Sequence, residues 1–139
     1  MGLVYAQIRL TNADDIALSK RNYIKKDEIR YINVNAMVDS GAYMLAINES
    51  IKIQLGLDVI DEKTAQLADG SLVTLDVVGP IQVIFENRKA MCNAMVLSGE
   101  TEVLLGAIPM EEMDVLIHPK EQKLIVNPAH PYQAQLSLK

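Results

Sequence analysis

The sequence contains little cysteine and no long apolar run. Cys92 is its single cysteine, so no disulfide can form within the chain and no site that needs two thiols is possible. Nowhere do apolar residues approach the roughly 18 in succession that a membrane helix requires, and the N-terminus lacks the charged and apolar regions of a signal peptide. These absences predict a cytoplasmic protein with no membrane partner.

Basic residues are also in the minority. The chain has 13 Lys and Arg against 18 Asp and Glu, which gives a net charge of -5. Proteins that bind nucleic acids gather Lys and Arg to neutralise phosphates. Here the one local basic cluster, between residues 20 and 26, is followed directly by Asp27 and Glu28, and we interpret it as a solvated surface segment. No nucleic-acid partner is therefore expected.

Aromatic residues are few, with one Phe and no Trp, whereas Val, Ile, Leu, Ala and Met make up most of the hydrophobic half of the chain. The β-branched members of this set favour strands and aliphatic packing. A chain of 139 residues has the length of one domain with one core. We therefore predict a single, mostly β domain over residues 1–139, with its core in residues 31–126.

Alternation of apolar and polar residues predicts the strands. Residues 3–10 and 31–38 both alternate with the period of two that is typical of a half-buried strand. Asp69 and Gly70 supply the backbone angles of a tight hairpin turn. Further strands are expected at residues 64–67, 72–78, 81–85 and 90–97, with a last hairpin that turns at residues 119–122.

Two short helices are also expected. Asn48 can cap the first, whose inner face consists of Ile51 and Leu55 and whose end is marked by Gly56. The second, over residues 109–113, begins with a proline, which suits the first helical turn because that turn needs no N–H donor.

The pattern is weak in two stretches. In residues 11–30 the apolar positions are too sparse to define a helical face, so we expect a loop, an insertion or a long hairpin connection. Residues 128–139 form a tail with no clear pattern.

The sequence Val-Asp-Ser-Gly-Ala at residues 38–42 is the sharpest feature. Asp39 ends an apolar strand, where removing a carboxylate from water is unfavourable, so an acid at this position indicates a functional role. Gly41 permits a tight turn whose N–H groups point at the carboxylate, and the Ser40 hydroxyl can bond across to a neighbouring loop. Asp-Ser-Gly alone is also a common turn. Its setting strengthens the functional interpretation, because a glycine-bearing hairpin and a Leu-Leu-Gly segment before a helix follow later in the chain.

With these features, residues 31–126 resemble the retropepsin-like aspartic proteases, the family of retroviral proteases and their single-domain bacterial relatives. The resemblance implies a closed β barrel with one or two short helices, which acts as a homodimer on extended peptide or protein substrates and needs no cofactor or metal. It also implies a catalytic Asp39 in a loop supported by Ser40, Gly41 and Ala42. The flap over the substrate would contain Leu67, Ala68, Asp69, Gly70 and Ser71, and the segment behind the loop would be Leu104, Leu105 and Gly106.

Hydrolysis by this route needs two carboxylates that share one proton around a water molecule. The chain has no second Asp-Ser/Thr-Gly, because the residues from Asp69 to Ser71 have the wrong order. The second carboxylate would then be Asp39 of another copy, related to the first by a twofold axis.

Other chemistries have less support. His118 and His130 are 12 residues apart and neither has a second histidine at helical spacing, which argues against a zinc site. Neither Ser40 nor Ser71 lies in the pattern of a hydrolase nucleophile. One alternative stays open, namely a protease-like fold that serves as a peptide-binding or dimerisation module with little or no turnover.

Overall fold

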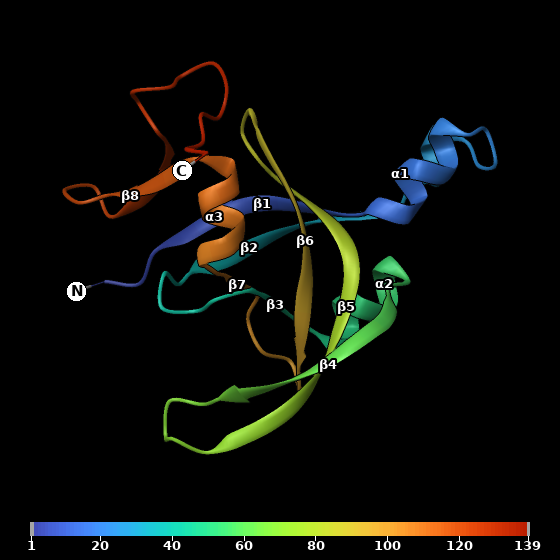
Figure 1. Cartoon of the computed structure of the whole chain (residues 1–139), viewed down its shortest axis with the longest axis horizontal. Coiled ribbons are helices and arrows are strands. Elements are labelled where there is room, and N and C mark those ends of the chain that lie inside the picture. Colours follow the sequence, from blue (N-terminus) through green and yellow to red (C-terminus); the bar gives the residue numbers. More distant parts are fainter. Residues whose placement is uncertain (1, 139) are drawn as a thin grey trace.

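The computed structural model describes residues 2–138 and shows a mostly β protein with three short α-helices (Figure 1). The elements in chain order are β1 (Tyr5–Asn12), α1 (Ala13–Lys20), the 3₁₀ helix η1 (Lys26–Glu28), β2 (Tyr31–Val38), β3 (Leu45–Asn48), α2 (Glu49–Leu55), β4 (Asp58–Gln66), β5 (Leu72–Phe85), β6 (Arg88–Leu97), β7 (Leu104–Leu105), α3 (Ala107–Met113), β8 (Val115–His118) and β9 (Lys123–Val126).

Seven of the strands form one sheet, which returns on itself. The strand order is β1-β2-β7-β3-β6-β5-β4, and β1 also pairs with β5. The sheet therefore closes into a ring, and β4 lies outside the ring on the free edge of β5. The strands β8 and β9 form a separate antiparallel pair.

The core lies inside the ring because each strand turns one set of alternate residues inward. In β1 the side chains of Ala6, Ile8 and Leu10 are buried. The residues between them face outward, where Gln7 and Arg9 donate hydrogen bonds to asparagine side chains of β2, each 3.0 Å long. The alternation predicted for residues 3–10 and 31–38 is confirmed.

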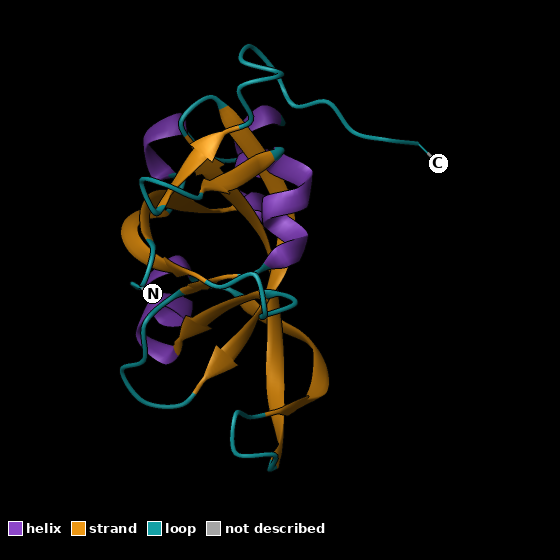
Figure 2. Ribbon diagram, turned by 90° about the vertical axis from the view of Figure 1, so that its left-hand side faces the viewer, coloured by secondary structure: helices purple, strands orange, loops and turns teal. Residues whose placement is uncertain are grey.

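The longest strand, β5, joins two segments that the sequence predicts as separate strands. It runs through Gly79 and Pro80, where its pairing with β6 shifts register between Val78 and Ile81. Its second half belongs to the ring, whereas its first half pairs with β4 in a hairpin that reaches away from the body of the molecule (Figures 1 and 2).

The helix α2 confirms the capping prediction. The side chain of Asn48 accepts a hydrogen bond of 2.9 Å from the backbone N–H of Ile51, and Gly56 follows the last turn in the left-handed conformation. The helix α3 begins two residues earlier than predicted, at Ala107, and Pro109 still lies in its first turn.

The loop predicted for residues 11–30 is wrong in part, because this connection between the antiparallel strands β1 and β2 contains α1 and η1. A polar anchor stabilises α1 in place of an apolar face. Asn12 caps the helix by accepting a hydrogen bond of 3.1 Å from the Asp15 backbone, and the buried Asp15 carboxylate pairs with Arg30 at 2.9 Å.

The chain after β9 has no regular structure and is fastened to the body by polar groups. Asp114, directly after α3, accepts a hydrogen bond of 3.0 Å from the Asn127 side chain and one of 3.1 Å from the Gln135 backbone, and one of its oxygens lies 2.6 Å from His130 Nδ1. The guanidinium of the buried Arg88 donates to the His130 carbonyl oxygen. Within residues 2–138, no helix is long and apolar enough to cross a membrane.

Candidate active site

The carboxylate of Asp39 is held by the tight turn that follows β2. The backbone N–H of Gly41 donates a hydrogen bond of 3.0 Å to Asp39 Oδ1, and the N–H of Ala42 donates one of 3.1 Å to the Asp39 carbonyl oxygen. The side chain of Asp39 is half-buried, whereas Ser40 is exposed. The Ser40 hydroxyl has no hydrogen-bond partner among the residues described, so the expected bond to a neighbouring loop is not present within one chain.

The short strand β7 lies directly behind this turn. It pairs in parallel with the end of β2, where Leu104 and Leu105 are opposite Met37 and Val38, and it also pairs with β3. The N–H of Asp39 donates a hydrogen bond of 3.0 Å to the Leu105 carbonyl oxygen. The Leu-Leu segment thus fixes the position of Asp39 through backbone hydrogen bonds.

Gly106 continues this support, because only a residue without a side chain fits there. A Cβ atom at position 106 would lie 2.2 Å from the Met44 carbonyl oxygen and 2.9 Å from that of Ala42. The next two residues donate backbone hydrogen bonds to the same segment, from Ala107 to Ala42 at 2.8 Å and from residue 108 to residue 43 at 3.0 Å. Residues 39–44, named the Asp39 loop from here on, therefore rest on the start of α3.

The β4–β5 hairpin forms the second wall of the site. Its turn contains Gly70, with a φ of 87°, and Asp69, whose carboxylate accepts hydrogen bonds from the Ser71 hydroxyl at 2.6 Å and the Ser71 N–H at 2.9 Å. These bonds lower the pKa of the Asp69 carboxyl. Asp69 therefore shapes the turn of the hairpin.

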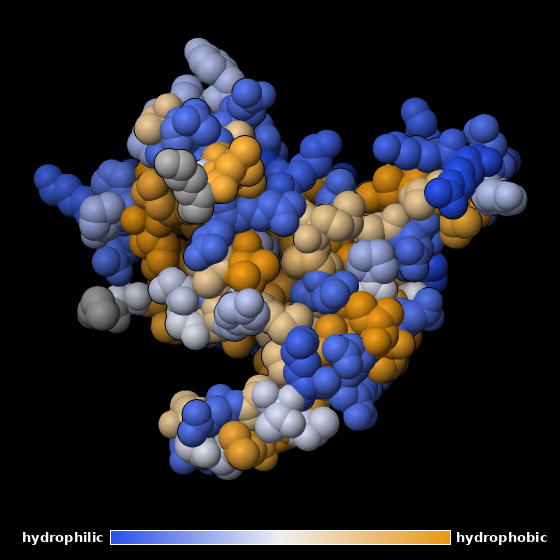
Figure 3. All heavy atoms as spheres, in the orientation of Figure 1, coloured by the Kyte–Doolittle hydropathy of each residue, from blue (hydrophilic) through white to orange (hydrophobic). Residues whose placement is uncertain are grey.

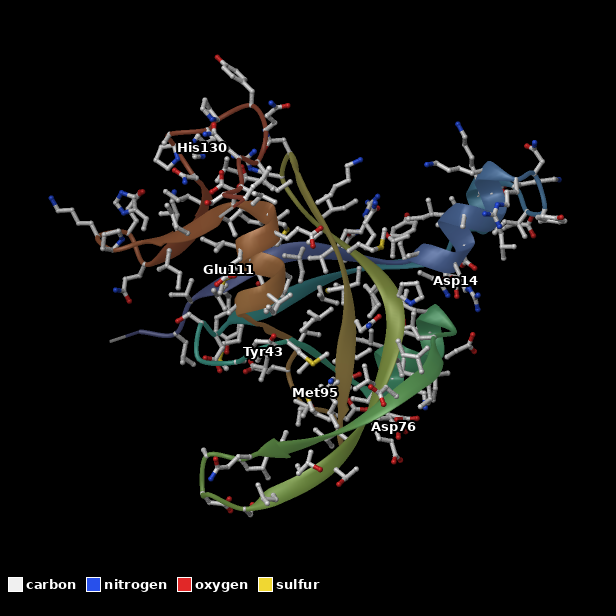
Figure 4. The ribbon with its side chains drawn as sticks, in the orientation of Figure 1. Asp14, Tyr43, Asp76, Met95, Glu111 and His130 are labelled. Atoms are coloured by element: carbon white, nitrogen blue, oxygen red, sulfur yellow. The ribbon has the colours of Figure 1, made fainter. Side chains whose placement is uncertain are left out.

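A hollow of about 400 Å³ separates the Asp39 loop from the hairpin, and Figure 3 shows this face concave between them. Its lining is mostly apolar and comes from several elements. Figure 4 places Tyr43 of the loop and Met95 of β6 on this side of the body. This hollow, named the main hollow from here on, is lined by residues 41–44 and 46, residues 63–67, Leu75, Met95, Leu97 and Leu104.

The sequence-predicted residues fall into three groups. Gly41, Ala42, Leu67 and Leu104 line the main hollow. The residues Asp39, Ser40, Leu105 and Gly106 belong to the loop and its support and do not line the hollow. The residues Ala68, Asp69, Gly70 and Ser71 form the turn of the hairpin, together with Leu67, and are exposed.

Sequence reasoning missed much of the lining of the hollow. Lys63, Leu75 and Met95 are brought together by the pairing of β4 with β5 and of β5 with β6, and Tyr43 of the Asp39 loop lines the same hollow. Tyr43 follows the Asp-Ser-Gly-Ala motif directly in the sequence, which is the one local signal for its place at the site. The other three residues carry no local signal.

The remaining candidates lie elsewhere. His118 Nδ1 accepts backbone hydrogen bonds in the β8–β9 turn, and His130 lies beside Asp114. No group of three metal-ligating side chains is found within residues 2–138. Burial, with a further contribution from Glu112, raises the pKa of the Cys92 thiol to about 12, so this thiol is protonated and a poor nucleophile at neutral pH.

Models of known protein families give no match to this sequence, and a search of curated proteins finds no match either. The geometry of the site provides one carboxylate in a fixed turn, a mostly apolar hollow beside it and a hairpin across the hollow.

Proposed function

We propose that the protein is an aspartic endopeptidase of the retropepsin-like type, in which two copies each contribute Asp39 to one active site. The observation that carries the proposal is the support of the Asp39 loop. A carboxylate after a strand is fixed by its own turn, by the Leu105 carbonyl and by the close approach of Gly106. The loop that carries it borders a hollow opposite a hairpin through Gly41 and Ala42. An ordinary Asp-Ser-Gly turn needs none of this surrounding support.

The chemistry follows from the electrostatics of two neighbouring carboxylates. Two such groups at close range cannot both ionise, so the pair holds one proton. The ionised carboxylate removes a proton from water, whose oxygen attacks the peptide carbonyl carbon, while the protonated one donates to the carbonyl oxygen. Proton return to the peptide nitrogen then allows the C–N bond to break.

The second copy would dock on the side of the molecule that carries the start of β1 and the β8–β9 pair (Figure 1). Each strand of the β8–β9 pair has one edge without a strand partner among residues 2–138, and residues 5–8 of β1 pair with β2 alone. Such edges can accept a strand from another chain. The closure of the ring into a barrel of the retropepsin type belongs to the same proposal.

Substitution of Asp39 by Asn tests the mechanism, because it removes the shared proton and leaves the shape nearly unchanged. We expect the wild-type protein to cleave a mixed peptide library between about pH 4 and 7 in a pepstatin-sensitive manner, and Asp39→Asn to lose cleavage by at least about a thousandfold. Cleavage is measured by mass spectrometry of the products.

Asp27→Asn serves as the matched control, because Asp27 is exposed and its side chain makes no hydrogen bond within the described part of the chain. This variant should cleave like the wild type. Full activity in Asp39→Asn would contradict the mechanism. Peptide binding without cleavage by the wild-type protein would favour the alternative of a binding module.

A further inference from the structure

A second hollow lies next to the main one. It measures about 280 Å³, and its lining includes the apolar side chains of Met91, Ile108 and Pro109. The two hollows share Tyr43, Met44 and Lys63 in their walls. An extended peptide that occupies the main hollow would therefore pass close to the second one.

Lys63 is the one side chain charged at neutral pH among the residues that line either hollow. It lies in β4 opposite Leu75 of β5. Its ammonium group has no carboxylate within ion-pairing distance in the part of the chain that the structure describes, although Asp61 and Glu62 precede it directly. Lys63 is exposed. The cleft, as the two hollows together are named from here on, thus has an unpaired cation on its mostly apolar wall.

We infer that the cleft selects extended peptides in which an apolar residue is accompanied by a nearby acidic residue, whose carboxylate pairs with Lys63. In an extended chain, side chains two positions apart point to the same side and lie roughly 6.5 Å from one another. An apolar side chain can therefore fill one hollow while a carboxylate close to it in sequence reaches Lys63. The inference deepens the proposed function and rests on it.

The electrostatics favour an acidic substrate over a neutral or basic one. A carboxylate beside an unpaired ammonium gains a charge-assisted hydrogen bond, and a bound peptide displaces water from the cleft, which strengthens that interaction. A basic residue at the same place would put two like charges together without a compensating group.

The test uses a series of peptides with one apolar core, in which a single Glu is moved along the peptide by one position at a time and each member has a matched Gln peptide. At one or two positions, we expect the wild-type protein to cleave the Glu peptide with a kcat/KM about three to ten times higher than that of the Gln peptide. The Lys63→Gln variant should lower this ratio to about one.

Three further variants separate charge from structure. Lys63→Arg should keep the preference, and Lys63→Glu should reverse it in favour of a peptide with Lys at that position. Lys89→Gln is the matched control, because Lys89 is also exposed on a strand, in β6, and lines neither hollow. Its Glu preference should equal that of the wild type.

The outcomes distinguish the inference from the proposed function. The inference would be overturned if every Glu and Gln pair were cleaved at equal rates, or if the Glu preference survived in Lys63→Gln. Neither result would contradict the proposed peptidase activity. If no peptide is cleaved, binding of the same labelled peptides is measured by fluorescence anisotropy. A Glu preference in binding that Lys63→Gln abolishes would support the inference and overturn the peptidase, and the absence of any binding would overturn both.

Discussion

At the scale of single residues, the position of Asp39 depends on a residue that has no side chain. The carboxylate is bonded by the N–H of Gly41, but the loop as a whole rests on Gly106, which lets the start of α3 approach the carbonyl oxygens of Ala42 and Met44. Backbone groups hold most of this arrangement. Side-chain substitutions around Asp39 should therefore disturb it less than a methyl group at position 106.

Gly106→Ala should lower the free energy of unfolding by about 1–3 kcal/mol, because the new Cβ atom meets backbone that cannot move aside cheaply. Urea unfolding followed by circular dichroism measures the change. Gly2→Ala is the matched control, since the nearest atom to a Cβ at that position lies 3.9 Å away. Equal unfolding midpoints for the two variants would contradict the importance of the close approach.

At the scale of elements, the chain after β9 is attached to α3 chiefly through Asp114. The hydrogen bond from the Asn127 side chain, followed by that from the Gln135 backbone, lowers the pKa of the Asp114 carboxyl to about 2. An Asp in an unfolded chain has a pKa of about 3.9. Because the folded value is the lower one, the ionised carboxylate stabilises the fold above about pH 4, and this contribution is lost as the pH falls toward 2.

Asp114→Asn should therefore be less stable than the wild type at pH 6, and the difference should shrink as the pH falls from about 4 to 2. Asn tolerates the left-handed backbone of this position, where φ is 55°, so backbone strain does not confuse the comparison. Denaturant midpoints at a series of pH values measure the effect. A difference that stays constant down to pH 2 would show that the charge of Asp114 is not responsible.

Features encoded by neighbouring residues could be predicted from the sequence, and features made by distant residues could not. The alternation in β2 and the capping of α2 by Asn48 are local, and both predictions are confirmed. The helix α1 was missed because its anchor joins Asp15 to Arg30 across a turn of chain with no apolar pattern. Much of the lining of the hollow was missed for a similar reason, since strand pairing brings Lys63 to its wall.

At the scale of the whole molecule, each chain has one carboxylate in its Asp39 loop and one hairpin beside its hollow. The proposed enzyme is therefore complete only as a symmetric pair, with the loops of the two copies facing one another across the twofold axis. Activity should depend on the fraction of chains that are paired, because the active site is itself part of the interface.

Mixing of subunits tests this requirement. When wild-type and Asp39→Asn chains are mixed in equal amounts, unfolded and refolded together, only pairs of two wild-type chains carry both carboxylates. Activity should fall to about a quarter of that of the same total amount of wild type, which is the share of such pairs in random pairing. Sedimentation velocity measures in the same samples whether the chains form the expected dimer. A fall to one half would indicate that each chain acts alone.

The position of β7 in the sequence also bears on the timing of protein synthesis. A chain emerges from the ribosome with its N-terminus first, and residues 1–97 contain the Asp39 loop, the hairpin and every strand of the ring except β7. The Leu105 carbonyl and Gly106, which fix the loop, follow only afterwards. A chain synthesised only as far as residue 97 therefore has an unsupported loop, and a cell that produces this protein is not exposed to an assembled site before residues 105 and 106 have emerged.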